Sequence, residues 1–286
     1  RITCRPMEII EAIEPLRTAV GHLSCPVGLV PTMGFLHAGH LALIERAREE
    51  TRSLVVSIFV NPEQFETDED IKTYPRDIDS DFLKLEQAGV DLVFTPSVLE
   101  VYPPGFASYV EIGQIGQKLE GEYRPGHFKG VATIVCKLIS LIRPDRAYFG
   151  EKDFQQTRVV SQLDKDFNLG CEIIVLPTVR EPDGLALSTR NVYLDSRERD
   201  AATILYRALS LAREMVRDGI RDAGEVRFRM REAICAEPLS SLDYISIVDE
   251  ATLEEIDSIN DSARALVAIR IGKTRLIDNI SLSVTD

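Results

Sequence analysis

The sequence lacks any apolar run long enough to cross a bilayer, which takes about 18 consecutive residues. Its longest candidate, residues 130–142, is interrupted by Lys137. Residues 1–6 also lack the apolar core of a secretory signal peptide. We therefore expect a chain without a membrane partner.

Cysteine is sparse and scattered. Five thiols are an odd number, and no pair has the CxxC spacing of zinc ribbons or redox sites. The sequence therefore predicts neither a disulfide framework nor a structural zinc site, and a reducing cytoplasm fits best. The cysteines are Cys4, Cys25, Cys136, Cys171 and Cys235.

Basic residues are outnumbered: 33 Lys and Arg against 46 Asp and Glu give a formal net charge of −13. Such a chain is a poor candidate for binding nucleic acid, although a local patch can still bind a nucleotide. No low-complexity tract is present, and a hydrophobic fraction of 44% is typical of a packed globular protein. The length of 286 residues predicts one large or two modest domains.

Strand-like and helix-like segments alternate through the first 180 residues. Residues 54–60, for example, form a continuous apolar run, as expected of a strand covered on both faces. This order predicts an α/β fold with a Rossmann-like, doubly wound parallel sheet. The expected strands are 27–33, 54–60, 91–94, 146–149 and 172–176, and the expected helices are 41–51, 77–88, 131–142 and 153–167.

The pattern changes after Ser188, where two helix-like segments precede a series of short strands. This order predicts a smaller C-terminal α+β domain with an antiparallel sheet. We place the domains at residues 1–180 and 181–286. The expected helices are 197–218 and 223–236, and the expected strands are 244–248, 265–271 and 275–277, with a turn at Gly272-Lys273.

The segment His37-Ala38-Gly39-His40 lies between a predicted strand and a predicted helix. A helix N-terminus offers N–H groups and the positive end of a dipole, so it attracts phosphate. If the helix begins at Ala38 or Gly39, both imidazoles share a face and can meet one anion. A histidine there can stabilise a phosphoryl oxygen whose charge grows in the transition state. The alternative is that the two histidines only cap the helix.

A second charged loop, Gly150-Glu151-Lys152-Asp153, follows another predicted strand. Ligands of parallel α/β sheets lie beyond the carboxyl ends of the strands, so we expect loops 31–40, 61–64 and 150–153 to converge. Lys152 is a compact charge of the kind that binds nucleotide phosphates. Asp153 could orient Lys152, cap the next helix or lie near magnesium. The alternative is a helix cap with an ion pair.

Three further polar segments carry weaker signals. Asn61 and Gln64 are amides that donate and accept, which suits a hydroxyl beside a carboxylate, although an Asn-Pro turn with a polar face explains this segment better when it is taken alone. Arg124 and His127 could meet a phosphate or lie in a surface turn. Residues 187–191, at the expected domain junction, could reach phosphates from the second domain or form an ordinary linker.

Taken together and in order, these segments resemble the pantoate–β-alanine ligase family of the HxGH nucleotidyltransferase superfamily. The resemblance covers about residues 6–280, and the complete series is far more specific than any one motif. The matching motifs are PTMGFLHAGH at 31–40, FVNPEQF at 59–65, YPR at 74–76, RPGHF at 124–128, FGEKDFQQ at 149–156, PTVRE at 177–181 and STRN at 188–191.

The resemblance implies a two-step reaction. The pantoate carboxylate attacks the α-phosphate of Mg-ATP, which gives pantoyl-adenylate and pyrophosphate. β-Alanine then attacks the acyl carbon, which gives pantothenate and AMP. The resemblance also implies ATP as co-substrate, Mg²⁺, a cytoplasmic homodimer, and a C-terminal domain that closes over the site.

The resemblance also implies roles for individual residues. His40, as proton donor, His37 and Lys152 would be catalytic. Gln64 and Gln156 would bind pantoate, with Gln64 also near β-alanine and Asn61 helping to position the substrate. Asp81 would lie near magnesium and the phosphates, and Arg124 and His127 would make secondary phosphate or structural contacts. The implied ATP-binding residues are Met33, Gly34, Phe35, Leu36, His37, Ala38, Gly39, His40, Gly150, Glu151, Lys152, Asp153, Val179, Leu187, Ser188, Thr189 and Arg190.

The sequence departs from the family pattern at four positions. Leu187 stands where Met is expected, Thr189 where Ser is expected and Phe154 where Tyr is expected. Ser80 precedes Asp81 where a second acid is common, which weakens the implied metal contact. None of these changes removes a proposed catalytic group.

Two other functions are compatible with an HxGH loop. The first is a nucleotidyltransferase that transfers AMP or CMP to a phosphate-bearing acceptor, but the neutral amides Asn61 and Gln64 suit a hydroxy acid better. The second is a nucleotide-sensing or interaction protein without activity, which the intact His37, His40 and Lys152 argue against.

Overall fold

A computed structural model describes residues 6–65 and 68–283 of the chain. It divides into two compact units, which are described separately. The first comprises the chain up to Glu151 together with Gln155–Pro177, and the second comprises Lys152–Phe154 and the chain from Thr178 onward. The chain therefore passes to the second unit after Pro177, and the short segment with Lys152 also groups with that unit.

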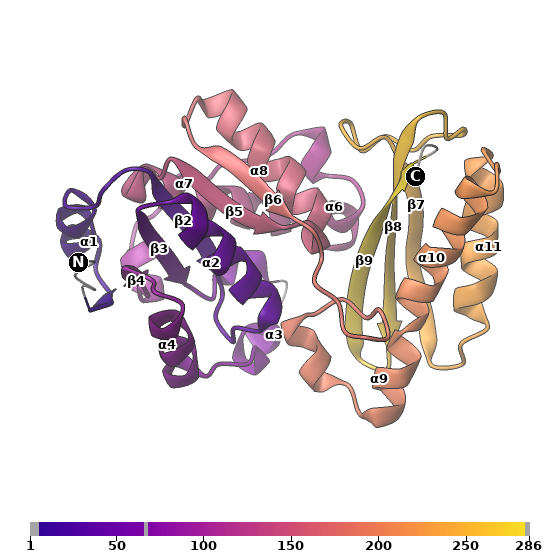
Figure 1. The fold of residues 1–286 in the computed structure, drawn as a ribbon, viewed down its shortest axis with the longest axis horizontal. Helices are drawn as coiled ribbons and strands as arrows, with labels where there is room; N and C mark the ends of the chain where they lie inside the picture. Colours follow the sequence, from indigo (N-terminus) through magenta and orange to yellow (C-terminus); the bar gives the residue numbers. More distant parts are fainter. Residues whose placement is uncertain (1–5, 66–67, 284–286) are drawn as a thin grey trace. The chain divides into compact units, whose positions relative to one another are not determined.

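The first unit is built on a six-stranded sheet in which every pair of neighbouring strands is parallel (Figure 1). Its strand order is β1-β4-β3-β2-β5-β6. β3 is buried along its whole length, as an apolar strand covered on both faces must be. The strands are β1 (Glu8–Ile10), β2 (Val27–Thr32), β3 (Ser53–Ile58), β4 (Leu92–Phe94), β5 (Arg146–Gly150) and β6 (Glu172–Leu176).

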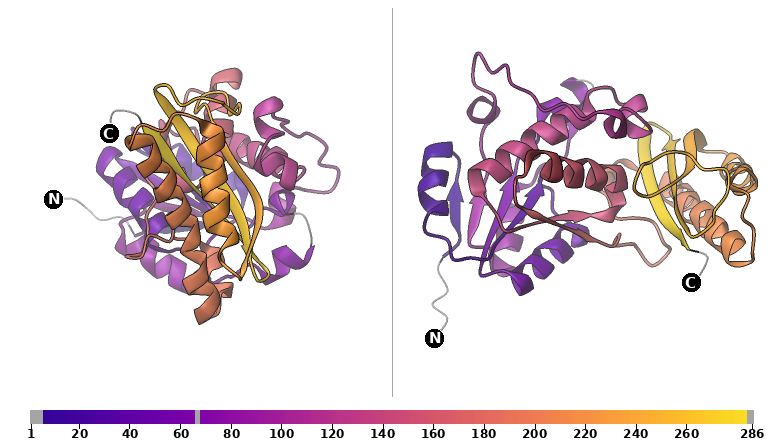
Figure 2. Two further views of the ribbon diagram at one scale, coloured as in Figure 1. Left: turned by 90° about the vertical axis from the view of Figure 1, so that its right-hand side faces the viewer. Right: turned by 90° about the horizontal axis from the view of Figure 1, so that it is seen from above.

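Helices cover both faces of this sheet (Figure 2). The buried core on one face includes residues of α1, α7 and α8, and the core on the other includes residues of α2 and α4. This is the doubly wound α/β arrangement expected from the sequence. The helices are α1 (Ile13–Val20), α2 (Ala38–Glu50), α3 (Asp68–Thr73), α4 (Ile78–Gln87), α5 (Val98–Val101), α6 (Glu120–Tyr123), α7 (His127–Ile142) and α8 (Phe154–Phe167), with short 3-10 helices η1 (Pro62–Gln64), η2 (Gln114–Gly116) and η3 (Glu151–Asp153).

The sheet has its topological switch point between β2 and β5, because the chain continues from β2 toward one edge and from β5 toward the other. The pairing of β2 with β5 ends at Leu29 and Ala147, whereas β2 pairs with β3 as far as Thr32. Pro31 lies just past that point and has no N–H to donate to a neighbouring strand. The carboxyl ends of β2 and β5 are therefore not paired with each other, at the position where doubly wound sheets bind ligands.

The second unit packs two long helices against a three-stranded antiparallel sheet of order β7-β8-β9. The helices α10 and α11 lie side by side on one face of this sheet (Figures 1 and 2). The expected α+β architecture is therefore present. The elements are η4 (Thr189–Tyr193), α9 (Ser196–Ala202), α10 (Ile204–Arg217), α11 (Ala223–Cys235), β7 (Ser240–Val248), β8 (Ser262–Ile271) and β9 (Thr274–Ser283).

Several expected boundaries were wrong. α7 begins at His127, four residues before the expected start, so His127 is a helical residue and not a loop residue. Glycine disfavours helices, so the presence of Gly130 placed the expected start of this helix one turn too late. The expected helix 197–218 is two helices that join at Thr203, whose hydroxyl donates to the main-chain oxygen of Asp200 at 2.7 Å. The short elements β1 and α1 were not predicted at all.

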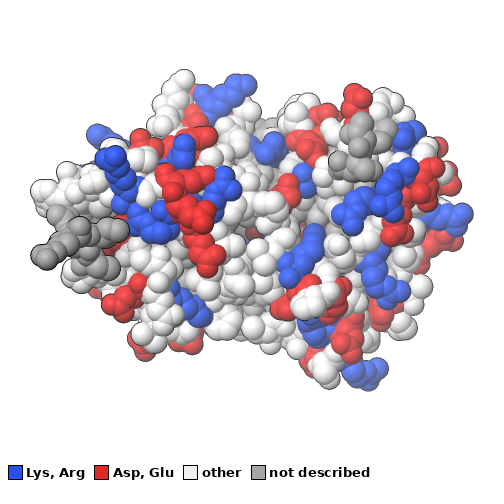
Figure 3. Space-filling view, in the orientation of Figure 1, with Lys and Arg blue, Asp and Glu red and all other residues white. Residues whose placement is uncertain are grey.

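Within the described part of the chain, none of the helices has the length and apolar character needed to span a bilayer. On the face shown in Figure 3, basic and acidic side chains are interspersed.

Candidate active site

Three loops with the expected site residues leave the same edge of the first sheet. β3, β2 and β5 are adjacent and parallel, and the segments after them begin at Phe59, Met33 and Glu151. Loops 31–40 and 61–64, two of the three loops expected to converge, therefore leave the same edge of the sheet within this unit. Glu151 is the last residue of the first unit before the short segment Lys152–Phe154, which groups with the second unit.

The two histidines form a reciprocal cap at the start of α2. Nδ1 of His37 accepts the N–H of Gly39 at 3.1 Å, and Nδ1 of His40 accepts the N–H of His37 at 3.3 Å. The ring centroids lie 4.1 Å apart. Because both Nδ1 atoms accept main-chain hydrogen bonds, the neutral rings carry their proton on Nε2. Helix capping uses Nδ1 of each ring, so it does not conflict with ligand binding through the protonated Nε2.

The loop before the histidines adopts an uncommon backbone conformation. Gly34 and Phe35 have φ values of 82° and 53°, and Phe35 is a non-glycine residue in the left-handed region. A Cβ at Gly34 would lie 3.0 Å from the side chain of Ile58 and 3.1 Å from Asp81. The turn therefore needs glycine, and it needs outside support to hold Phe35 in place.

That support comes from α4. The two carboxylate oxygens of Asp81 accept the N–H groups of Phe35 and Leu36, each at 2.7 Å. Nζ of Lys84, one turn further along, donates to the main-chain oxygen of Leu36 at 2.8 Å and lies 4.0 Å from Asp81. The side chain of Asp81 is 2% exposed. Asp81 therefore fixes the histidine loop, and its implied place near magnesium stays a prediction.

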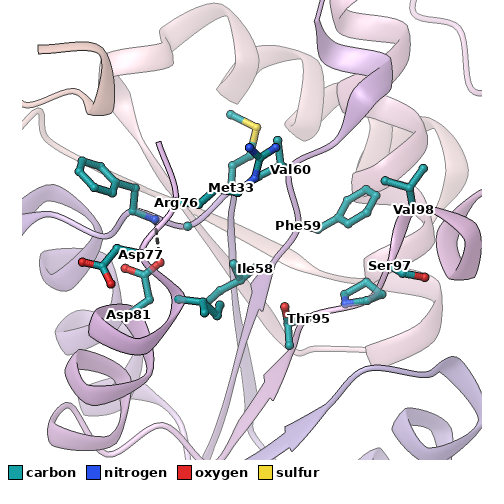
Figure 4. Close-up of a pocket in the computed structure, with 14 residues that line it drawn as sticks. Met33, Ile58, Phe59, Val60, Arg76, Asp77, Asp81, Thr95, Ser97 and Val98 are labelled. Atoms are coloured by element: carbon teal, nitrogen blue, oxygen red, sulfur yellow. Dashed lines mark hydrogen bonds between the residues drawn. The ribbon is translucent and has the colours of Figure 1, made fainter. Parts of the chain in front are cut away.

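A pocket of about 330 Å³ opens beside this loop at the carboxyl ends of β2, β3 and β4 (Figure 4). Asp77 and Asp81 lie on one side of it, and Ser97 and Val98 lie on the opposite side. Its volume is at the low end of the range of small-molecule sites, which is roughly 300–1,000 Å³. It is lined by residues 33–35, 58–60, 76–78, 81 and 95–98.

Gln64 is held by two sets of contacts. Nδ2 of the buried Asn61 donates to Oε1 of Gln64 at 2.9 Å and to the main-chain oxygen of Gly130 at 3.0 Å. Arg124 and His127 both contact the main-chain oxygen of Gln64 at 3.0 Å. The sequence predicted either phosphate contacts or a surface turn for Arg124 and His127. In the structure both side chains support Gln64.

Gly130 allows this arrangement because α7 approaches η1 very closely. A Cβ at Gly130 would lie 2.1 Å from the main-chain oxygen of Glu63 and 2.9 Å from the nitrogen of Gln64. No larger side chain fits between the two backbones unless they move apart. Sequence analysis did not identify this role, although an isolated glycine inside a helix often marks such a contact.

The two neighbouring glutamines at the start of α8 differ in environment. Gln155 is buried, accepts the N–H of Glu120 at 3.0 Å, and donates to Ile115 and Lys118 at 2.9 and 2.7 Å. Gln155 therefore fixes the 115–120 segment. Gln156, the predicted substrate ligand, is half-buried on the first turn of α8.

In the second unit, Lys152 lies in the 3-10 turn that precedes α8. Its ammonium is 3.7 Å from Oδ1 of Asp153, and the two side chains are 20% and 49% exposed. Asp153 therefore pairs with Lys152, and its possible place near magnesium stays a prediction. Among the described residues, no cluster of three or more His, Cys, Asp or Glu side chains could form a metal cage.

The remaining predicted nucleotide ligands lie on a small hairpin of the second unit. Leu187 donates to the main-chain oxygen of Val179 at 3.0 Å. Ser188 caps η4, and its hydroxyl accepts the N–H of Arg190 at 3.2 Å. The base of the hairpin is fixed by Arg180, which forms two bonds of 2.6 and 2.9 Å with the buried Asp278. Val179, Leu187, Ser188, Thr189 and Arg190 are thus brought together.

Comparison with known proteins gives one consistent family. Residues 8–281 match the family model described as pantoate-beta-alanine ligase. Over 276 residues the chain is 53% identical to the pantothenate synthetase of Roseiflexus castenholzii, a match that covers 96% of this chain and 99% of the relative.

Solved structures agree with this family. A pantothenate synthetase from Thermus thermophilus superposes with a TM-score of 0.92 at 47% identity, covering 96% of this chain and 99% of that one. The pantoate-beta-alanine ligase from Francisella tularensis, solved with beta-gamma ATP and beta-alanine, gives a TM-score of 0.80 at 37% identity, covering 96% and 97%.

Proposed function

Because this chain belongs to the pantoate–β-alanine ligase family, we propose how its residues carry out the ATP-dependent condensation of pantoate with β-alanine. The family assignment decides against the two alternative functions, a nucleotidyltransferase and an inactive binding protein. The reaction passes through pantoyl-adenylate. The contacts within each unit support the residue roles proposed below.

ATP binds to the loop Met33–His40 through its phosphates. The N-terminus of α2 supplies main-chain N–H groups and the positive end of the helix dipole. His37 and His40 add two Nε2–H donors, because their Nδ1 atoms cap the helix. Gly150, Glu151, Lys152 and Asp153 contribute to the same nucleotide, with Lys152 as the phosphate-binding cation. Val179, Leu187, Ser188, Thr189 and Arg190 complete the ATP ligands.

Pantoate binds to the amides of Gln64 and Gln156. Oε1 of Gln64 is occupied by Asn61, so Gln64 meets a substrate oxygen through its Nε2 donor. Asn61 is 1% exposed and acts through Gln64 without direct substrate contact. Gln64 also lies near the amine of β-alanine in the second step.

In the first step a carboxylate oxygen of pantoate forms a bond to the α-phosphorus, and the bond from that phosphorus to the bridging oxygen of pyrophosphate breaks. Negative charge grows on phosphoryl oxygens, where the Nε2–H donors of His37 and His40 and the Lys152 ammonium stabilise it. The proton-donor role that the resemblance implies for His40 is here that of a hydrogen-bond donor, because this step itself transfers no proton. The protein contributes mainly position and preorganised charge.

In the second step the amine of β-alanine forms a C–N bond to the acyl carbon and releases a proton to solvent, and AMP leaves with the electrons of the acyl–oxygen bond. Adenylation is needed because a free carboxylate is a poor electrophile. Neither a serine nor a cysteine nucleophile is required.

Magnesium enters with the triphosphate. Mg²⁺ keeps several waters and takes phosphate oxygens with only one or two carboxylates, so it needs no all-protein cage. Asp153 fits this requirement, because its carboxylate is half exposed beside Lys152, whereas both oxygens of Asp81 accept amide hydrogen bonds. The ion supplies charge neutralisation to the phosphates when bound.

The reciprocal cap of His37 and His40 is the observation that carries this proposal, and His40 variants test it. In His40→Ala we expect pantothenate formation to fall more than about tenfold, equivalent to about 1.4 kcal/mol of transition-state stabilisation. His40→Asn keeps an acceptor near Nδ1 but has no Nε2 donor, so we expect it to fold normally and remain slow.

Turnover is measured as pantothenate formed from ATP, pantoate and β-alanine. Adenylation is measured as pyrophosphate released from ATP when pantoate is present and β-alanine is left out. His22→Ala is the matched control, because His22 is exposed in the turn after α1. Near-normal turnover of both His40 variants would rule out the proposed role of His40.

Two further features belong to the proposal. A cytoplasmic location is supported by Cys25, Cys136, Cys171 and Cys235, which are all free thiols.

A homodimer is supported by exposed apolar side chains of the first unit such as Leu83 and Leu99, at 60% and 70% exposure. Light scattering of the purified protein tests the dimer, and a monomeric mass across micromolar concentrations would refute it.

A further inference from the structure

Tyr102, which lies outside the motif segments of the sequence, forms a hydrogen bond with the side-chain amide of Asn61, which in turn holds Gln64. The hydroxyl of Tyr102 donates to Oδ1 of Asn61 at 2.8 Å. Nδ2 of Asn61 in turn donates to Oε1 of Gln64 at 2.9 Å and to the main-chain oxygen of Gly130 at 3.0 Å. Asn61 is 1% exposed, so these bonds form away from solvent.

The orientation of both amides follows from the chemistry of the partners. The main-chain oxygen of Gly130 can only accept, so the NH₂ end of Asn61 must face it. The same NH₂ group then faces Gln64, which turns the Oε1 end of Gln64 inward. The carbonyl end of Asn61 needs a donor, and Tyr102 supplies it. If either amide were reversed, two acceptors or two donors would face each other.

Tyr102 is itself held in a fixed position. Its ring lies 5.0 Å from that of Phe106 in an edge-to-face arrangement and 6.2 Å from that of Phe59. The ammonium of Lys137 lies 5.5 Å from the Tyr102 ring centroid and donates to the main-chain oxygen of Val101. Burial raises the pKa of Tyr102 above its usual value, so the phenol remains a donor at working pH.

We propose that Tyr102 is a positioning residue for pantoate: through Asn61 it holds the Gln64 amide with its Nε2 donor toward the substrate oxygens. This proposal rests on the substrate-binding role of Gln64 proposed above. Tyr102, which is 41 positions from Asn61 in the sequence, thereby contributes to recognition of an oxygen-bearing acid.

Tyr102→Phe tests the proposal, since it removes only the hydroxyl and leaves the ring in place. Loss of the donor leaves the buried Oδ1 of Asn61 without this hydrogen bond and weakens the hold of Asn61 on the Gln64 amide. We expect the KM for pantoate to rise about fivefold, the effect of one neutral hydrogen bond. The KM for ATP should change less than about twofold, and the melting temperature should stay close to that of the wild type.

Tyr109→Phe is the matched control. Tyr109 lies in the same aromatic cluster, 5.2 Å from Phe106, but its hydroxyl takes no part in the bonds to Asn61. We expect this variant to keep the wild-type KM for pantoate. An equal rise in both variants would overturn the proposal, because it would reflect disturbed packing of the cluster.

A double mutant separates positioning from general stability. In a Gln64→Ala background, Tyr102→Phe should change the KM for pantoate less than about twofold, because the amide that Tyr102 orients is gone. An undiminished effect there, or no effect of Tyr102→Phe alone, would overturn the role of Tyr102. If Gln64→Ala alone leaves the KM unchanged, the binding role of Gln64 fails instead, and the proposal built on it falls as well.

Discussion

The side-chain amide of Asn279 donates a hydrogen bond to the main-chain oxygen of Lys152 across 2.9 Å. Asn279 is 4% exposed on β9, and its Oδ1 accepts from Arg264 at 3.0 Å. The guanidinium of Arg264 lies 4.2 Å from the ring centroid of Phe154. Two adjacent strands of the second unit therefore fix the turn that presents the proposed phosphate-binding lysine.

Asn279→Asp should weaken this turn without unfolding the sheet. The carboxylate keeps an acceptor for Arg264 but replaces the amide donor that faced Lys152 with an oxygen. We expect the KM for ATP to rise about fivefold or more, as for a lost buried hydrogen bond, while the KM for pantoate stays constant. Steady-state kinetics check this against Asn260→Asp, an exposed amide in the same unit. Equal effects in both variants would contradict the assignment.

Asp81→Asn distinguishes support of the loop from metal binding. The amide keeps one acceptor but presents an NH₂ group to a main-chain N–H, so we expect the free energy of unfolding to fall by about 2 kcal/mol. Turnover should fall too, because Phe35 loses support in its left-handed conformation. The magnesium concentration for half-maximal activity should not change, as measured by titration. Asp79→Asn, exposed on the same helix, is the control, and a large rise in magnesium requirement for Asp81→Asn alone would restore the metal role.

The sequence could predict the parallel sheet and the loops because both depend on local pattern. The apolar run of β3 and the placement of His37 before a helix are visible within a few residues. The residues that hold these loops in place lie far from them in the sequence. Asn279 and Lys152 are 127 residues apart, and Asp81 and Phe35 are 46 residues apart. Their partners are main-chain atoms, which carry no signature in the sequence.

The support that Asp81 gives to the histidine loop was also invisible in the sequence. An acid near a phosphate motif suggests a cation site, and only the fold shows that both of its oxygens face backbone amides. Gly130 was hidden for a related reason, since the constraint on it comes from the backbone of another segment. Residues that touch substrate are predictable from the motif, whereas residues that hold them require the tertiary structure.

Gly130→Ala should damage both stability and pantoate binding. The new methyl would lie 2.1 Å from the main-chain oxygen of Glu63, so α7 and η1 would have to separate. Such overpacking costs about 1–3 kcal/mol, and we expect the upper part of that range because the contact is with backbone. Chemical denaturation measures it, with Gly113→Ala as control, since a Cβ there meets nothing within 4 Å. A Gly130→Ala enzyme with unchanged stability and KM would refute the close approach.

Cys171 should be the least reactive of the thiols whose environment the structure describes. It is 2% exposed, and burial, with the nearby carboxylates of Asp164 and Asp145, raises its pKa to about 12. At about pH 8 the folded protein should therefore react with iodoacetamide at Cys25 and Cys235, which are exposed, and leave Cys171 unmodified until urea is added. Peptide mass spectrometry resolves the three sites.

The raised pKa of Cys171 also makes the free energy of unfolding depend on pH. The thiol in the unfolded chain loses its proton near about pH 8.5, whereas the folded thiol keeps it up to about pH 12. The unfolded state therefore binds fewer protons in this window, and the free energy of unfolding should fall as pH rises through it. Cys171→Ala removes this contribution, so its stability should decline less steeply between about pH 9 and 11 than that of the wild type. Parallel stability curves for the two proteins, or rapid labelling of native Cys171 at pH 8, would show that the thiol is not buried as described.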